Sequence, residues 1–457
     1  MGLLRLAVPA ALLLWFLWKA RTNRLCLLGI PVLMVMGQSV FFDNMKVFWR
    51  PGRLDATTLT MAWLFVVWLF TATRPASDPL GVKVGPLGPS RILPEELPFL
   101  LLALVMAGHT LGLFGTTGDL AGAASTAFPT FCLILGYVLL RGIVSHATRA
   151  ETLDFLETVV MANTVAAALF FVHQGLHVTI YPYGEYLSTV FAGQQITRTF
   201  TFAPQFSLLA LGFILGRREW TPKWIAVLVV TMLAILVSYT RSLLIAAVVA
   251  LVLAIVVQEL SRPNVSRVVR RSVAIVASGC GAVALFALLR PVDYKFLLSR
   301  LNEFTSGKGV SDIANWKNRT HHFGIVERVV AKGDLWFGLG YKPNVGIGAA
   351  NLHAWISDMA WVPILYYFGV IGLALFGLVL GGFLARSLWL SRQSSEDGRY
   401  LGIMCTITIT LTIIASFTGW LFMEPRVYPM GLFILAFAAV EALRRRDDDS
   451  MGAVEGV

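Results

Sequence analysis

The sequence predicts an all-α polytopic membrane protein with about 12–13 transmembrane helices and one large, partly helical loop outside the cytoplasm. Three observations support this fold class. Apolar residues make up 57% of the 457-residue chain, while Asp, Glu, Lys and Arg make up only 14%, against about 25% in soluble domains. The charged residues cluster between long uncharged stretches. These stretches lack the alternating polarity of barrel strands, so we expect them to be helices.

The same composition excludes several other classes. A chain this apolar is neither disordered nor built as a disulfide scaffold, and its four cysteines lie inside apolar runs without paired spacing. The net charge of +11 suggests an anionic partner, but membrane topology explains much of it, and we expect no nucleic-acid binding.

Apolar stretches long enough to cross about 30 Å of hydrocarbon recur along the chain. The first resembles a signal peptide, but Lys19, Arg21 and Arg24 follow it in place of a small-residue cleavage site. We therefore interpret it as a retained anchor. The predicted spans are 3–18, 25–42, 56–73, 97–114, 121–140, 153–175, 200–216, 222–239, 242–260, 272–289, 359–385, 400–421 and 427–443.

The basic residues fix the predicted orientation. More than half of the 37 Lys and Arg lie in alternate linkers and in the C-terminal tail, which the positive-inside rule assigns to the cytoplasm. The N-terminus is then outside and the C-terminus inside. The chain divides into ten helices in 1–289, an extracytoplasmic loop at 290–357, the last helices in 358–443 and a cytoplasmic tail at 444–457. The basic linkers are 19–24, 74–96, 141–152, 217–223, 261–271 and 386–399.

The stretch from Trp224 to Val257 is predicted to be a helical hairpin. As one helix it would be about 50 Å long, far more than a bilayer core, so it must fold back at the polar SYTRS segment, 238–242. Both flanks are basic, so Arg241 lies at the outer boundary. There it either extends to the lipid headgroups or binds an anion.

The loop 290–357 carries most of the candidates for chemistry. It has more basic than acidic residues, which would attract an anionic head group, although a solvated loop also explains these charges. Within it, Trp316–Val330 is predicted to form a short helix with Arg319 and His322 near one face. Gly338 and Gly340 then mark tight turns.

Two candidate bases lie where the loop meets the next span. His353 is either a general base for a sugar hydroxyl or an interfacial histidine. Asp358 is either an alternative base or the N-cap of the following helix. His321 and His322 do not form a zinc-binding spacing with His353, so we predict no metal site.

Other polar residues lie outside this loop. Arg198 precedes a central span, and Glu424 and Arg426 lie together in the last outer turn, where they either pair or support the site. His109 and Asn163 lie inside spans, where we expect them to form hydrogen bonds between helices.

Four motifs between residues 190 and 385 together resemble the O-antigen ligase and O-antigen polymerase superfamily of bacterial inner-membrane enzymes. The first is RTFTFAPQFSLLAL, an arginine-containing segment that opens a central span, and the second is the hairpin tip SYTRSLL. The third is RTHHF followed by the DLWFGLG turn. The fourth is a His- or Asp-bearing segment before YYFGVIG.

This resemblance implies a metal-independent, inverting glycosyl transfer of the GT-C-like type, without a cofactor. Arg198, Arg241 and Arg319 would then hold the diphosphate of an undecaprenyl-diphosphate-linked glycan, and His353 or Asp358 would take the proton from the acceptor hydroxyl. Residues that would support this site are Glu303, His322, Glu424 and Arg426.

One departure from the family pattern favours a polysaccharide polymerase over a ligase that transfers O-antigen to the lipid A core. In the ligases a His-Asn pair lies about eleven residues before the final glycine. Here Asp358 is that distance from Gly369, and His353 lies five residues earlier, followed by Ala354.

The implied partners are the lipid-linked glycan, a glycan or lipid-core acceptor, membrane lipids and a chain-length regulator protein. The implied location is the bacterial inner membrane, with the active face in the periplasm. A flippase for lipid-linked oligosaccharide is an alternative of another class, and a structural assembly subunit is a third. The sequence contains no internal repeat, and its polar groups gather at the outer boundary, which favours surface chemistry over transport.

Overall fold

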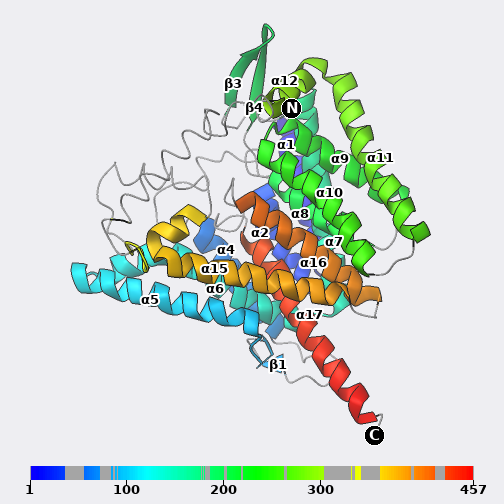
Figure 1. Cartoon of the computed structure of the whole chain (residues 1–457). Coiled ribbons are helices and arrows are strands. Elements are labelled where there is room, and N and C mark those ends of the chain that lie inside the picture. Colours follow the sequence, from blue (N-terminus) through cyan, green and yellow to red (C-terminus); the bar gives the residue numbers. More distant parts are fainter. Residues whose placement is uncertain are drawn as a thin grey trace.

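Helices dominate the computed structural model, and most of them run alongside one another in a bundle (Figure 1). The structure describes residues 2–36, 56–72, 84–85, 88–89, 91–176, 178, 180, 186–199, 203–217, 220–261, 265–302, 331, 335–340, 361–392, 396–416 and 428–455.

The first half of the chain begins with α1 (Gly2–Lys19), the 3-10 helix η1 (Arg24–Leu28), α2 (Gly29–Met36) and α4 (Ala56–Ala72). It continues with η2 (Pro94–Glu96), α5 (Leu97–Thr117), α6 (Leu120–Ser145), α7 (Arg149–Phe170), the π-helical turn η3 (Phe171–Gly175) and α8 (Ala203–Gly216). The second half contains α9 (Pro222–Val237), α10 (Arg241–Ser261), α11 (Val265–Leu289), α12 (Pro291–Asn302), α15 (Trp361–Ser391), α16 (Glu396–Ser416) and α17 (Tyr428–Glu455).

A helix lies at each of the thirteen predicted span positions. The predicted break between two helices is also confirmed, because α9 ends at Val237, just before the SYTRS segment, and α10 begins at Arg241 within it. Four helical stretches in the described ranges are long and apolar enough to cross a membrane, and several shorter helices are also apolar. The four are Pro94–Thr117, Arg149–Gly175, Ser272–Leu289 and Ile364–Ser391.

Local sequence signals set the helix ends. Gly118 takes a left-handed conformation at the end of α5, which a residue without a side chain adopts at little cost. The Asp119 side chain then accepts the Gly122 N–H at 2.9 Å and caps α6. At α7, Thr148 and Glu151 cap each other's backbone N–H groups in a capping box.

The core lies along α8, α16 and the first half of α17, whose described side chains are almost all buried. By contrast, α5 and α11 present exposed apolar faces, with Leu104 and Leu111 on the first and Val273 and Leu288 on the second. Such extended apolar surface is unfavourable in water. The arrangement is compatible with a membrane protein whose outer helices face lipid.

Residues of five basic linkers meet at one end of the bundle, which we call the basic end. Ion pairs connect segments that are far apart in the sequence, so these segments share one end of the molecule. The C-terminus lies beyond this end and the N-terminus lies at the other, the opposite end (Figure 1). The ion pairs are Lys19–Asp154, Arg141–Glu96, Arg386–Glu95, Arg149–Glu441, Arg217–Glu157 and Lys223–Glu157.

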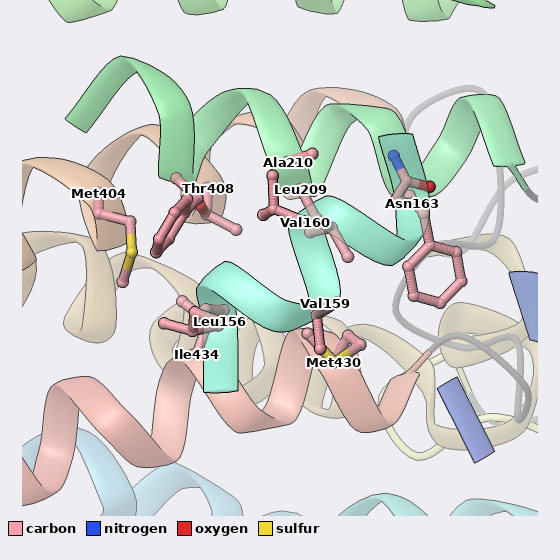
Figure 2. A pocket seen from close by; sticks show the side chains of 12 residues that line it. Leu156, Val159, Val160, Asn163, Leu209, Ala210, Met404, Thr408, Met430 and Ile434 are labelled. Carbon is pink, nitrogen blue, oxygen red and sulfur yellow. The ribbon is translucent and has the colours of Figure 1, made fainter. Parts of the chain in front are cut away.

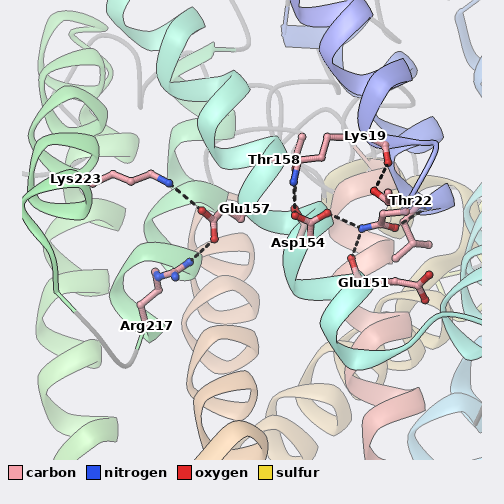
Figure 3. A network of polar contacts seen from close by, with 10 residues as sticks. Lys19, Thr22, Glu151, Asp154, Glu157, Thr158, Arg217 and Lys223 are labelled. Atoms are coloured by element: carbon pink, nitrogen blue, oxygen red, sulfur yellow. Dashed lines mark hydrogen bonds and ion pairs between the residues drawn. The ribbon is translucent and has the colours of Figure 1, made fainter.

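Two carboxylates of α7 organise part of the basic end (Figure 3). Asp154 accepts hydrogen bonds from Lys19 and from Asn23, which hold the first helix against α7. Glu157, one turn further along α7, accepts a hydrogen bond from Lys223 at 2.9 Å. The first predicted span is therefore tied to the bundle by polar contacts as well as by apolar packing.

Two short antiparallel hairpins add to the predicted all-α fold. One joins β1 (Val84–Gly85) to β2 (Gly88–Pro89), and the other joins β3 (Tyr186–Phe191) to β4 (Gln194–Thr199). The second turns at Ala192 and Gly193, which both have positive φ, as a two-residue type I′ turn requires. It lies at the opposite end, beside α12 (Figure 1).

Candidate functional site

The structure describes the backbone of two predicted anion ligands, both at the opposite end. Arg241 is the first residue of α10. Arg198 lies in β4, where it pairs with Leu187 of β3, and precedes α8. The other predicted site residues lie outside the described ranges; they are Glu303, Arg319, His322, His353, Asp358, Glu424 and Arg426.

The turn that leads to Arg241 has a well-defined geometry. The Ser238 hydroxyl donates to the Ile235 carbonyl at 2.7 Å and accepts the Thr240 N–H at 3.2 Å. Between them, Tyr239 has a φ of 50°, a left-handed conformation that costs a non-glycine residue on the order of 1–3 kcal/mol. This cost must be offset by the interactions of the Tyr239 side chain.

The Tyr239 side chain is buried against an ion pair at the start of α12. Asp293 is 1% exposed, and its carboxylate accepts a hydrogen bond from Nε of Arg290 at 2.6 Å. The Tyr239 hydroxyl faces this carboxylate and Gln174 of η3, although neither contact has the geometry of a normal hydrogen bond.

A row of three aromatic rings connects the two arginine-bearing segments. The Phe296 ring of α12 makes edge contacts with Tyr239 at 5.7 Å and with Phe191 of β3 at 5.4 Å between centroids. Such edge-to-face contacts add to the energy of apolar burial. Because β3 is paired with β4, this row fixes the strand that carries Arg198 relative to the turn before Arg241.

A second feature joins two of the family-like motifs. The segment LWFGLG, residues 335–340, docks on a break in α15 at Gly369, whose φ is 63°. Leu339 N–H donates to the Tyr366 carbonyl and Gly340 N–H to the Tyr367 carbonyl.

Two further hydrogen bonds run the other way, from Val370 N–H to the Leu335 carbonyl and from Ile371 N–H to the Trp336 carbonyl, at 3.0 and 3.1 Å. In a regular helix, Tyr366 and Tyr367 would accept from Val370 and Ile371. The docked segment, which we call the inserted turn, therefore bonds to the four backbone groups that would otherwise pair with each other within α15.

Glycine is required at this contact for steric reasons. A Cβ atom on Gly338 would lie 2.5 Å from the Gly369 nitrogen, and one on Gly369 would lie 2.3 Å from the Trp336 oxygen. Gly338 and Gly340 also have φ values of 76° and 63°. The sequence predicted tight turns at Gly338 and Gly340, and both positions adopt conformations that favour glycine.

Two polar residues inside spans were predicted to form hydrogen bonds between helices. Asn163 of α7 donates to the Ser207 hydroxyl of α8 at 3.1 Å, as predicted. His109 of α5 packs on the inserted turn: a Cβ on Gly340 would lie 2.7 Å from its Nδ1, and its ring is 5.8 Å from that of Phe368.

Asn163 also lines a cavity between α7, α8, α16 and α17 (Figure 2). The cavity measures about 20 Å³, which is enough for one water molecule and far too small for a lipid chain. We therefore do not assign it to a substrate. Its walls are formed by Leu156, Val159, Val160, Asn163, Phe206, Leu209, Ala210, Phe213, Met404, Thr408, Met430 and Ile434.

The sequence did not reveal the residues that position the segments of the candidate site. Tyr239 lies inside the SYTRS motif, but nothing in the sequence indicated that this bulky residue would adopt a left-handed backbone conformation. Asp293 and Arg290 belong to the predicted loop 290–357, and their spacing of three residues is typical of an ion pair on a helix. The β3–β4 hairpin did leave a signal, since β-branched residues flank Ala192 and Gly193.

These features define a bundle of apolar helices with arginine-bearing connections and a glycine-dependent inserted turn. Comparison of the sequence with models of protein families, and with curated proteins, gives no match. The resemblance to the O-antigen ligases and polymerases therefore depends on the four motifs alone.

Proposed function

We propose that this protein is a membrane glycosyltransferase that transfers glycan from undecaprenyl diphosphate to an acceptor sugar hydroxyl at the periplasmic face of a bacterial inner membrane. The observation that carries the proposal is the contact through Phe296 between β3, which pairs with the strand of Arg198, and Tyr239 in the turn before Arg241. Two segments that resemble the family's arginine motifs are thereby held at one end of an apolar bundle.

The chemistry of the arginines suits this reaction. A guanidinium group donates two parallel hydrogen bonds to phosphate oxygens and keeps its charge at any physiological pH. Arg198 and Arg241, with Arg319 from the loop, would neutralise the negative charge that develops on the departing diphosphate. The reaction would then need no metal, and His353 or Asp358 would accept the proton of the acceptor hydroxyl.

The inserted turn and α15 border, in the sequence, the stretch that carries the candidate bases. A hydrogen bond joins Gly340 to Tyr367. His353 and Asp358 lie between these two positions in the sequence and outside the described residues. We favour polymerisation over transfer to the lipid A core, because a carboxylate stands where the ligases have the His-Asn pair.

The test of the proposal is the substitution Arg241→Ala. We expect the variant to accumulate in the membrane at wild-type levels but to lose glycan chain elongation in cells, because the diphosphate would lose a ligand. Surface polysaccharide length would be measured by gel electrophoresis and protein level by immunoblotting. Arg270→Ala is the matched control, since Arg270 is an exposed arginine of a basic linker, and it should leave polymer length unchanged.

Purified protein incubated with a lipid-linked oligosaccharide separates the reaction classes. A longer lipid-linked glycan indicates a polymerase, and transfer to a lipid A core acceptor indicates a ligase. Movement of the substrate across the bilayer without any product would identify a flippase and contradict the proposal. Wild-type polymer in Arg241→Ala cells would also contradict it.

A further inference from the structure

We propose that the inserted turn is a re-entrant element that dips into the hydrocarbon layer, where Leu335, Trp336 and Phe337 contact bilayer acyl chains. This inference depends on α15 crossing a membrane and is independent of the proposed glycosyl transfer.

The depth of the turn follows from its hydrogen-bond partners. The helix α15 begins at Trp361, and the turn bonds to Val370 and Ile371. At 1.5 Å per residue, Val370 lies about 13 Å along the helix from Trp361. The turn therefore lies beside the apolar part of α15 and beyond its first turn.

A second helix gives a similar depth. His109 packs on Gly340, and α5 continues from His109 for eight more residues to Thr117, which is about 12 Å. The apolar stretch Pro94–Thr117 is another of the four long enough to cross a membrane. Two helices thus independently place the turn about 12–13 Å below their outer ends.

The polar groups of the turn permit this location. Non-helical backbone is tolerated at membrane depth where protein buries it or where it lines a water-filled cavity, because its N–H and C=O groups then have partners. Here four backbone hydrogen bonds connect the turn to α15, and Gly338 and Gly340 are buried. The break at Gly369 therefore supplies the hydrogen-bonding partners that the turn needs, and the turn does the same for α15.

The side chains of the turn identify what it contacts. Leu335, Trp336 and Phe337 are 50%, 62% and 49% exposed, three consecutive large apolar residues held on a fixed backbone. Leu378, further along α15, is 60% exposed. Apolar side chains at membrane depth beside an exposed face of a spanning helix fit acyl chains and do not fit water.

Spin labelling in nanodiscs tests the proposal. A nitroxide would be attached to Trp336→Cys in a Cys280→Ser background, since Cys280 is exposed and the other three cysteines are buried. Collision with oxygen, which concentrates in acyl chains, is compared with collision with a water-soluble nickel chelate. We expect oxygen to dominate at position 336, as at the control Leu378→Cys. The chelate should dominate at Val190→Cys, beside the β3–β4 turn.

Two outcomes would overturn the proposal. Dominant collision with the chelate at position 336 would place the turn in water. Low collision with both reagents would show that protein covers it. If Trp336→Cys does not yield a monodisperse protein, Phe337→Cys gives the same measurement at the neighbouring exposed position.

Discussion

Gly369 combines three requirements that most other glycines of α15 lack: a left-handed backbone, a close backbone neighbour and a broken hydrogen-bond ladder. Gly377 and Gly381 lie in the same helix, and a Cβ atom added at either position would have nothing within 4 Å. Glycine therefore has opposite effects at two positions of the same helix. At Gly369 it permits a contact, whereas at Gly377 it weakens the helix.

This contrast predicts the effect of alanine substitutions. Gly369→Ala should destabilise the protein by about 2 kcal/mol or more, because alanine is strained at positive φ and its Cβ would collide with the Trp336 carbonyl. Gly377→Ala should be neutral or stabilise by up to about 1 kcal/mol, because alanine favours helix. Thermal unfolding of the detergent-solubilised variants measures both, and equal midpoints would contradict the described contact.

At the scale of elements, the basic end contains ion pairs of two kinds. The Arg386 and Glu95 side chains are 14% and 5% exposed, so this pair between α15 and η2 is buried. The Lys223 and Glu157 side chains are 50% and 35% exposed. Exposed pairs are weak because solvent screens them. A buried charge that loses its partner is costly.

We therefore expect Arg386→Met to destabilise the protein by about 3–5 kcal/mol and Lys223→Met by no more than about 1 kcal/mol. The first substitution leaves the Glu95 carboxylate buried without its guanidinium, whereas Glu157 still has Arg217. Unfolding midpoints of the two variants provide the comparison. The double variant Glu95→Gln, Arg386→Met should recover much of the loss, and a failure to recover would mean that Arg386 acts mainly through packing.

At the scale of the whole molecule, the ion pairs and the basic linkers predict opposite exposure of the two ends. In intact spheroplasts, a membrane-impermeant maleimide should label Val190→Cys, because β3–β4 lies at the opposite end. It should label Arg270→Cys only after the membrane is opened, because Arg270 belongs to a basic linker. Both variants would carry Cys280→Ser. Labelling of Arg270→Cys, but not of Val190→Cys, in intact spheroplasts would show that the topology is the opposite of the predicted one.

Much of the helical framework was predictable because it follows from apolar length and charge distribution. The fold-back before Arg241 followed from length alone, since one helix would have been too long. The inserted turn was only partly predictable: Gly338 and Gly340 marked turns, but nothing local indicated that Gly369 would receive them. Tyr239 and Asp293 were missed because their significance depends on a contact between α12 and the α9–α10 turn, which no spacing in the sequence encodes.

The inserted turn also constrains the order in which the protein is assembled. During synthesis the segment at 335–340 emerges before residues 366–371, which complete its hydrogen bonds. Until they arrive it has exposed amide groups and three apolar side chains, and α15 likewise has an incomplete hydrogen-bond ladder at Gly369. Neither segment is complete without the other, so their docking must follow synthesis of the first part of α15. Closure of this part of the molecule is therefore a late step of folding, and mutations at the contact should lengthen the time that the nascent chain depends on chaperones.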